Sequence, residues 1–213
     1  TVSEATRILA IRHGETDWNR VARIQGHTDI ALNEAGRQQA SRLADALRDE
    51  PIAAVYTSDL SRALETAGAF ALPRGLPLHI EPRLRERCFG CFEGLTFDEI
   101  GARWPDQLLR WKRRDPDFGP DGGEALGDFY ARVIGCINAL VASHPGQQIA
   151  LVAHGGVLDC LYRAATRLPL DAPRTWQVAN AGINRLLHAE SGLMLVGWAD
   201  NAHLDDPSLP RAG

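Results

Sequence analysis

Two short stretches of the 213-residue chain place a histidine and a glycine directly after an apolar run. The first, "ILAIRHG", ends at His13 and Gly14, and the second, "IALVAHGG", contains His154 and Gly155 near its end. In an open parallel sheet, ligands bind beyond the carboxyl ends of the strands. If these two runs are neighbouring strands, both imidazoles lie in one crevice. Glycine lets the backbone approach a ligand closely, and helix N-termini there favour an anion.

Two arginines would make this crevice strongly cationic. Arg12 directly precedes His13, and Arg62 lies about one turn inside a helix predicted to follow a third apolar run. The guanidinium fork matches phosphate oxygens without needing a metal. A single histidine at a strand end is more often a hydrogen-bonded core residue, and a single arginine on a helix is usually solvated. Spacing alone therefore leaves open whether Arg12, Arg62, His13 and His154 share a phosphate site.

A shared site needs strands and helices that alternate along the chain. Apolar runs predict strands at 7–11, 52–56, 77–81, 149–153, 184–188 and 193–198, and helical patterns cover 33–47, 60–71, 124–141 and 156–168. Most runs are continuous, as expected for strands covered on both faces. The last two are joined by Glu190-Ser191-Gly192 and predict an antiparallel hairpin. We expect a three-layer α/β/α sandwich, in which a mostly parallel sheet has an antiparallel edge strand.

Composition limits the other classes of function. The length and the 45% of hydrophobic residues fit one domain over residues 1–213, with a helical, lid-like excursion at 83–120 and a loose tail at 205–213. The net charge of -4 gives no reason to expect a nucleic-acid surface. No apolar stretch is long enough for a membrane span, and the polar N-terminus does not resemble a signal peptide. We therefore expect a cytoplasmic protein.

The spacing of the cysteines does not predict a metal site. Cys88 and Cys91 form a single C-x-x-C with no second pair or nearby histidine to complete a zinc set. Cys136 and Cys160 lie in apolar, helix-like surroundings, where free cysteine behaves as a small hydrophobic residue. We expect no bound metal.

Four motifs, in chain order, resemble those of the histidine phosphatase superfamily, the phosphoglycerate mutase-like family. They are "RHGET" at 12–16 with Asn19, Gln25 and Gly26 after it, "TSDLSRALETA", "LRERCFGCFEGL" and "VAHGGVL". The resemblance runs from about residue 7 to residue 159, and the final hairpin also fits the family. It implies the phosphoglycerate mutase-like fold and no cofactor, and it allows a homodimer.

The resemblance implies roles for the matched residues. His13 would be the nucleophile, and Glu86 would protonate the leaving oxygen. Arg12, Arg62 and a protonated His154 would hold the phosphoryl group together with His13. The residues implied near the substrate are Asn19, Gln25, Gly26 and Gly155, and Ser58 would have a supporting role.

These roles predict a metal-independent phosphomonoester hydrolase of the histidine acid phosphatase type. It would act on a small-molecule phosphomonoester through a phosphohistidine. The alternatives are a cofactor-dependent phosphoglycerate mutase and a non-catalytic protein that binds phosphorylated ligands. The short segment between Glu86 and His154 favours the phosphatase. So do Phe97, near the position of a mutase lysine, and Gly156, at the position of a mutase asparagine.

Two features leave the substrate open. Arg113 and Arg114 resemble the mutase arginine pair and would contact a second anionic group, although a solvated basic turn fits them equally well. An aromatic set would either line an apolar lid over the substrate or belong to the core; its members are Trp18, Phe89, Phe92, Trp104 and Trp111.

Overall fold

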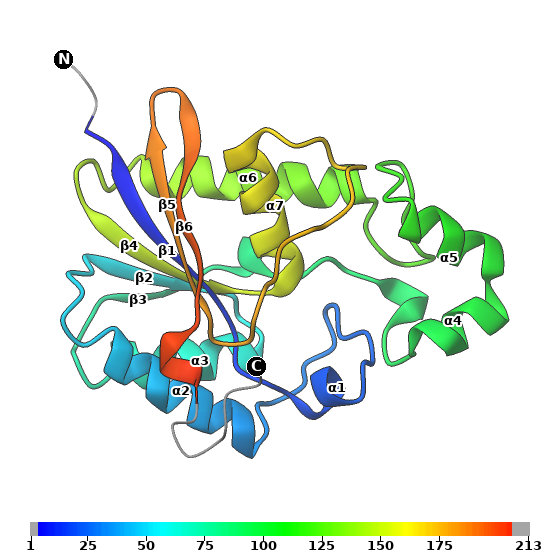
Figure 1. Cartoon of the computed structure of the whole chain (residues 1–213), viewed down its shortest axis with the longest axis horizontal. Coiled ribbons are helices and arrows are strands. Elements are labelled where there is room, and N and C mark those ends of the chain that lie inside the picture. The colour runs from blue at the N-terminus through cyan, green and yellow to red at the C-terminus, as the bar shows by residue number, and fades with distance from the viewer. Residues whose placement is uncertain (1–3, 206–213) are drawn as a thin grey trace.

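The computed structural model describes residues 4–205 as a six-stranded sheet with helices on both faces (Figure 1). The strands are β1 (Thr6–Arg12), β2 (Ala54–Thr57), β3 (Leu78–Ile80), β4 (Gln148–Ala153), β5 (Ile183–Ala189) and β6 (Gly192–Asp200). The α-helices are α1 (Asp17–Arg20), α2 (Glu34–Ala46), α3 (Ser61–Ala71), α4 (Phe97–Arg103), α5 (Pro105–Lys112), α6 (Leu126–Val141) and α7 (Gly155–Thr166). Most of the predicted tail, residues 206–213, lies outside the described residues.

The sheet order β3-β2-β4-β1-β5-β6 places the two histidine-bearing strands side by side. β1 and β4 are parallel, and Arg12 lies opposite Ala153 at their carboxyl ends. β2 pairs in parallel with β4 on its other side. β5 runs antiparallel to β1, and β6 runs antiparallel to β5. The predicted mostly parallel sheet with an antiparallel hairpin at one edge is therefore confirmed.

Alternate residues of the central strands place their side chains in two separate hydrophobic cores, one on each face of the sheet. This explains why the sequences of these strands are continuous apolar runs. On one face, Ile8 and Leu151 pack with the buried sides of α6 and α7. On the other face, Leu9 and Val152 pack with α2 and α3, including Leu43. Figure 1 shows the two helix pairs on opposite sides of the sheet. The three-layer α/β/α sandwich is confirmed.

The start of α3 differs from what its local sequence favours. Serine and aspartate are preferred N-cap residues, so the stretch "TSDLSRALETA" indicates Ser58 or Asp59 as the cap, but Leu60 occupies the N-cap position without a side-chain hydrogen bond. Asp29, from a distant loop, instead accepts hydrogen bonds from the backbone N–H and the hydroxyl of Ser61. Ser58 and Asp59 are used elsewhere, in contacts with His154 and Arg85. Their side chains bind tertiary partners, which local propensity cannot reveal.

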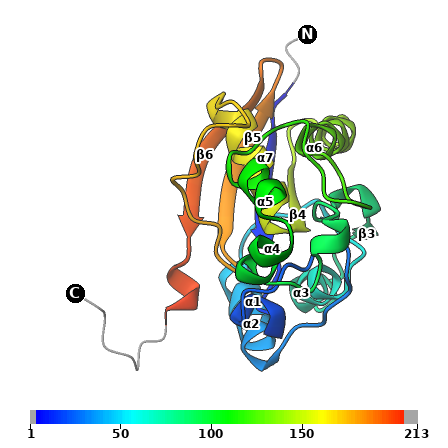
Figure 2. The same cartoon turned by 90° about the vertical axis from the view of Figure 1, so that its right-hand side faces the viewer.

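The excursion at 83–120 carries two 3-10 turns (Pro82–Leu84 and Gly90–Phe92) and helices α4 and α5. Figure 2 shows α4 and α5 on the side of the molecule that faces the viewer, in front of the sheet. They are held by a small aromatic core of their own, centred on Phe92, Ile100 and Phe118. Phe92 and Trp104 belong to this core and pack with their ring centroids 5.5 Å apart. Across residues 4–205, none of the helices has the length and apolarity needed to cross a membrane.

The packing of α2 predicts a large difference between two leucines. Leu43 is fully buried, whereas Leu72, which follows α3, is 70% exposed. We expect Leu43→Ala to lower the free energy of unfolding by about 2–5 kcal/mol, because it leaves a cavity in a packed core. We expect Leu72→Ala to change it by less than about 0.5 kcal/mol. Urea denaturation measures both, and equal effects would contradict the assignment of this core.

Candidate active site

The carboxyl ends of β1 and β4 bring His13 and His154 together. Their ring centroids lie 5.2 Å apart, and the two residues are 2% and 0% exposed. His13 directly follows β1, and its backbone N–H donates to the carbonyl of Ala153 at the end of β4. The two histidines that are 141 positions apart in the sequence therefore share one crevice because their strands are neighbours.

The tautomer of His13 follows from its hydrogen bond. Its Nδ1 lies 2.6 Å from the carbonyl oxygen of Gly14. A carbonyl oxygen only accepts, so Nδ1 carries the proton and Nε2 keeps its lone pair. Burial holds the pKa of His13 well below its ordinary value of 6.5, and the charges of Arg12 and Arg62 lower it further. His13 is thus a neutral imidazole at neutral pH.

Two guanidinium groups are fixed beside this imidazole by backbone carbonyls. Arg62 lies on α3 and donates to the carbonyls of Thr28 and Gly26, at 2.7 Å each. Arg12 donates through Nη1 to the carbonyl of Val178, at 2.7 Å. Burial lowers the pKa of Arg62 to about 10, so it stays charged at neutral pH. Carbonyl partners hold both groups in place without neutralising their charge.

His154 is held by the serine for which a supporting role is predicted. Its Nε2 lies 2.8 Å from the hydroxyl oxygen of Ser58, at the end of β2. Burial lowers the pKa of His154 well below 6.5, and the charge of Arg62 adds to this effect. The resemblance implies a protonated His154, whereas desolvation and nearby cations both oppose its charge and favour the neutral ring.

Three buried donor-capable atoms at this crevice have no hydrogen-bond partner within residues 4–205. They are Nε of Arg12, Nε of Arg62 and Nδ1 of His154. Buried polar atoms in native proteins are nearly always paired, so each such atom needs an explanation. An anion in the crevice would supply the missing acceptors.

Glu86 lies at the same crevice, held by backbone groups from two directions. Its carboxylate accepts hydrogen bonds from the backbone N–H of Gly156, at 3.0 Å, and of Arg87, at 2.8 Å. A Cβ at position 156 would collide with Glu86 Oε1, so this approach requires glycine there. The carbonyl of Glu86 accepts from Nε2 of His27 and Nη2 of Arg132.

The remaining predicted residues surround the entrance. A cavity of about 200 Å³ is lined by Arg12, His13, Asn19, Gln25, Gly26 and Arg62, among others. Asn19 and Gln25 are also structural: Asn19 completes a capping box with Thr16, and Gln25 accepts from the Thr16 hydroxyl. Gly26 has φ +55° and packs its backbone against Glu93.

A second cavity, of about 350 Å³, continues from the first. Both are lined by Arg12, Ile24, Glu86, Phe89 and Phe97. Gly155 and Trp111 line the second cavity only, and Trp18 lines the first only. Glu86 therefore lies at the junction, where a phosphoryl group in the first cavity would meet its leaving group in the second.

Sequence reasoning missed the loop between α7 and β5. Asn180 donates from Nδ2 to the carbonyl of His13, at 3.0 Å, and Val178 supplies the carbonyl that binds Arg12. Arg174, which also lies in this loop, and Asp159, which lies on α7, line the second cavity. Of these, only Asp159 had a signal, as a lone acid in the apolar helical stretch "GVLDCLY".

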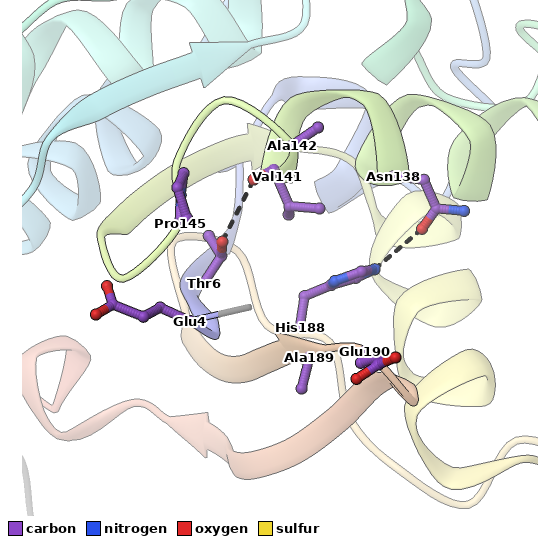
Figure 3. A pocket seen from close by; sticks show the side chains of 9 residues that line it. All are labelled: Glu4, Thr6, Asn138, Val141, Ala142, Pro145, His188, Ala189 and Glu190. Carbon is purple, nitrogen blue, oxygen red and sulfur yellow. Dashed lines mark hydrogen bonds between the residues drawn. The ribbon is translucent and has the colours of Figure 1, made fainter. Parts of the chain in front are cut away.

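A further cavity, of about 380 Å³, lies at the other end of β1 and carries no such cluster of cations (Figure 3). Glu4 and Glu190 line it. His188, which also lines it, is hydrogen-bonded to Asn138 at 3.1 Å. Its acidic lining does not suit an anion. No cluster of three or more potential metal ligands occurs across residues 4–205.

Comparison with known proteins identifies the family of this chain. A family model for the histidine phosphatase superfamily (branch 1) matches residues 8–201. "Phosphoglycerate mutase-like protein 4" of Arabidopsis thaliana is 37% identical over 97% of this chain and 90% of its own. "Metal-independent phosphoserine phosphatase" of Arabidopsis thaliana is 34% identical over 99% and 88%. The structure of a mycobacterial glucosyl-3-phosphoglycerate phosphatase in complex with VO3 is 36% identical, with a TM-score of 0.81 over 91% and 98%.

The chain therefore belongs to the histidine phosphatase superfamily, and its fold is phosphoglycerate mutase-like. The phosphatases among these similar proteins support an enzyme with phosphatase activity on a small phosphate.

Because burial lowers the pKa values of His13 and His154, we expect the folded protein to lose stability at pH values above the range in which carboxylates titrate. In the unfolded chain each imidazole gains a proton below pH 6.5, while the folded protein keeps both neutral. The folded state is therefore fully favoured above pH 6.5 and loses stability as the pH falls. The loss is up to about 1.4 kcal/mol per pH unit for each histidine.

Urea denaturation between pH 7 and pH 5 tests this expectation. His154→Gln removes one of the two groups and should give a shallower fall in the free energy of unfolding. His79→Gln replaces an exposed histidine and should leave the slope unchanged. An unaltered slope in His154→Gln would show that His154 does not stay neutral in the folded protein.

Proposed function

We propose that the protein hydrolyses phosphomonoesters of small molecules without a metal, through a phosphohistidine at His13. The observation that carries the proposal is the set of three unpaired buried atoms, Nε of Arg12, Nε of Arg62 and Nδ1 of His154, around a neutral imidazole. These atoms can bind phosphoryl oxygens, while the lone pair on Nε2 of His13 attacks phosphorus.

In the first step, the lone pair of His13 Nε2 forms a bond to phosphorus and the ester P–O bond breaks. The bond electrons go to the leaving oxygen, which takes a proton from the carboxyl group of Glu86. Arg12 and Arg62 stabilise the charge on the equatorial oxygens, the main requirement of phosphoryl transfer. The proton remains on Nδ1 and stays hydrogen-bonded to the carbonyl oxygen of Gly14. This hydrogen bond stabilises the positive charge that the ring acquires.

In the second step, a water oxygen attacks phosphorus and gives its proton to Glu86. The P–N bond breaks, its electrons return to Nε2, and inorganic phosphate leaves. His154 needs no fixed charge here: a bound phosphate dianion favours its protonation, and Ser58 holds the ring in either state. Each residue then returns to its starting form.

The phosphatase and mutase alternatives differ in the acceptor of the phosphoryl group. The similar proteins carry names of both kinds, including "Probable phosphoglycerate mutase GpmB" of Cronobacter sakazakii. Gly156 and Phe97 stand where the resemblance places mutase asparagine and lysine side chains, which supports water as the acceptor. Incubation with 3-phosphoglycerate and 2,3-bisphosphoglycerate separates the two: we expect phosphate release, and fast isomerisation without release would favour the mutase.

Turnover of p-nitrophenyl phosphate in excess chelator tests the proposal. We expect undiminished hydrolysis in the wild type and loss of at least about 10³-fold in His13→Ala, because the nucleophile is gone. His79→Ala, at an exposed position, is the matched control and should keep full activity. Loss of activity in chelator would contradict a metal-independent reaction, and binding of the ester without release would support a non-catalytic protein.

Glu86→Gln distinguishes leaving groups. A primary alkyl phosphate needs a proton on its leaving oxygen, so we expect its hydrolysis to slow by about 10²–10⁴-fold. p-Nitrophenolate leaves without a proton, so hydrolysis of its ester should slow far less. Glu65→Gln, an exposed substitution of the same kind, should affect neither. Equal slowing of both esters in Glu86→Gln would remove Glu86 from the role of acid.

A further inference from the structure

The orientation of the Arg62 guanidinium depends on one short loop. The backbone carbonyls of Gly26 and Thr28 accept hydrogen bonds from Nη2 and Nη1 of Arg62, at 2.7 Å each. Arg62 is only 1% exposed, and its Nε has no hydrogen-bond partner within residues 4–205. Because both terminal nitrogens are bound to the 26–28 loop, the position of this loop determines where Nε points.

The carboxylate of Glu93 binds the same loop through other atoms. Its Oε2 accepts from the backbone N–H of His27, at 3.2 Å. Its Oε1 accepts from the hydroxyl of Thr28, at 2.7 Å, and from the Thr28 N–H, at 3.0 Å, which also donates to the carbonyl of Gln25. Oε2 further accepts from the backbone N–H of Phe89, at 2.9 Å, so the segment that carries Glu93 also fixes its side chain. None of these donors carries a charge that would neutralise the carboxylate.

The peptide group between Gly26 and His27 links Glu93 to Arg62. Its carbonyl accepts from Arg62 and its N–H donates to Glu93, because the two groups point in opposite directions across a trans peptide. The positive and the negative charge thus lie at the matching ends of one peptide dipole, where the two hydrogen bonds strengthen each other. Burial lowers the pKa of Arg62 to about 10, and the charge of Glu93 is among those that oppose this fall.

Glu93 lies outside both cavities of the candidate site. It lines neither of them, whereas Gly26 and Arg62 line the first. Gly26 has φ +55°, and a Cβ at this position would collide with the Glu93 carboxylate. The loop and the carboxylate can therefore approach each other only because residue 26 is glycine.

Building on the proposed function, we propose that Glu93 is a positioning residue that orients Arg62 toward the phosphoryl group. Glu93 binds the 26–28 loop at two backbone N–H groups and one hydroxyl, and the loop binds Arg62 at two carbonyls. A direct ion pair would hold the guanidinium equally well but would cancel the charge that attracts the anion. Acting through a peptide group, Glu93 fixes the guanidinium and leaves its Nε available.

Glu93→Gln tests this role because it keeps the shape of the side chain and removes its charge. An amide has one acceptor oxygen, so its NH2 group would face N–H groups that now donate to a carboxylate. Calorimetry with inorganic phosphate measures the consequence for the anion site. We expect the Kd for phosphate to rise by roughly tenfold to a hundredfold, the range of hydrogen bonds to charged groups. The kcat/KM for p-nitrophenyl phosphate should fall by a similar factor.

Glu50→Gln is the matched control. Glu50 is also a partly buried, hydrogen-bonded carboxylate, but it binds Arg185 and Gln148 at the amino end of β4, away from the candidate site. We expect Glu50→Gln to leave both the phosphate affinity and kcat/KM unchanged. Destabilisation of the fold alone would then not produce the result expected of Glu93→Gln.

A double-mutant cycle with Arg62→Lys distinguishes positioning of Arg62 from a general loosening of the site. Lysine lacks the fork that binds both loop carbonyls, so it removes the group through which Glu93 acts. In the Arg62→Lys background, we expect Glu93→Gln to change kcat/KM by less than about threefold. An effect of Glu93→Gln that is undiminished in this background overturns the proposal.

Thr28→Val is a second variant that tests the same contact with a smaller change. It removes only the hydroxyl that donates to Oε1 of Glu93, and we expect it to weaken phosphate binding by at least about threefold. If both folded variants, or Thr28→Val alone where Glu93→Gln does not fold, bind phosphate as tightly as the wild type, the proposal is wrong.

Phosphate binding separates this proposal from the proposed function, because calorimetry needs no turnover. A wild type that hydrolyses no ester would reject the proposed function, while weaker phosphate binding in Glu93→Gln would still support the positioning of Arg62. Hydrolysis by the wild type, with the same phosphate affinity in folded Glu93→Gln, would keep the phosphatase and reject the role of Glu93.

Discussion

The hydrogen bond between His13 Nδ1 and the Gly14 carbonyl fixes which ring nitrogen can act as a nucleophile. It depends on a short chain of contacts from α3. The Gly14 N–H donates to the hydroxyl of Thr66, and that hydroxyl donates to the carbonyl of Arg62 one turn earlier. The helix that carries Arg62 therefore also orients the loop that sets the tautomer of His13. A free imidazole exchanges its tautomers, whereas this one is held in the form that leaves Nε2 unprotonated.

The same arrangement shows how a neutral imidazole can lie in a cationic crevice, as the proposed reaction requires. Burial, with the added charges of Arg12 and Arg62, lowers the pKa of His13 and keeps the ring uncharged, and backbone carbonyls hold the two guanidinium groups without neutralising them. Nε of Arg12, Nε of Arg62 and Nδ1 of His154 are buried and have no hydrogen-bond partner within residues 4–205. A phosphoryl group with three free oxygens has acceptors that would pair with these atoms.

Local sequence patterns predicted the sheet, and they predicted that His13 and His154 meet on the condition that their strands are neighbours. Continuous apolar runs mark buried strands, and a His-Gly pair after two such runs marks one end of the sheet. The resemblance added Glu86, which stands in the charged run "RLRER" and would otherwise be interpreted as surface. The structure places it on the backbone of Gly156, 70 residues away, a contact with no local signal.

The loop at 167–182 shows why the rest of the candidate site could not be predicted from the sequence. Arg174 and Asn180 have no periodicity that marks them, and their partners Asp159 and His13 lie elsewhere in the chain. The expected cap of α3 is absent for the same reason, since the side chains of Ser58 and Asp59 contact His154 and Arg85, which lie elsewhere in the chain. Contacts between distant segments depend on the completed fold, so they appear only once the strand order is known.

The most direct test is to trap the intermediate. Wild-type enzyme is mixed with p-nitrophenyl phosphate, quenched with alkali within milliseconds, digested, and analysed by mass spectrometry. The account predicts one phosphoryl group on the peptide that contains His13, stable to alkali and lost in acid, with none elsewhere. An enzyme that turns over while that peptide stays unmodified, or a phosphoryl group on another residue, would contradict the assignment of His13 as the nucleophile.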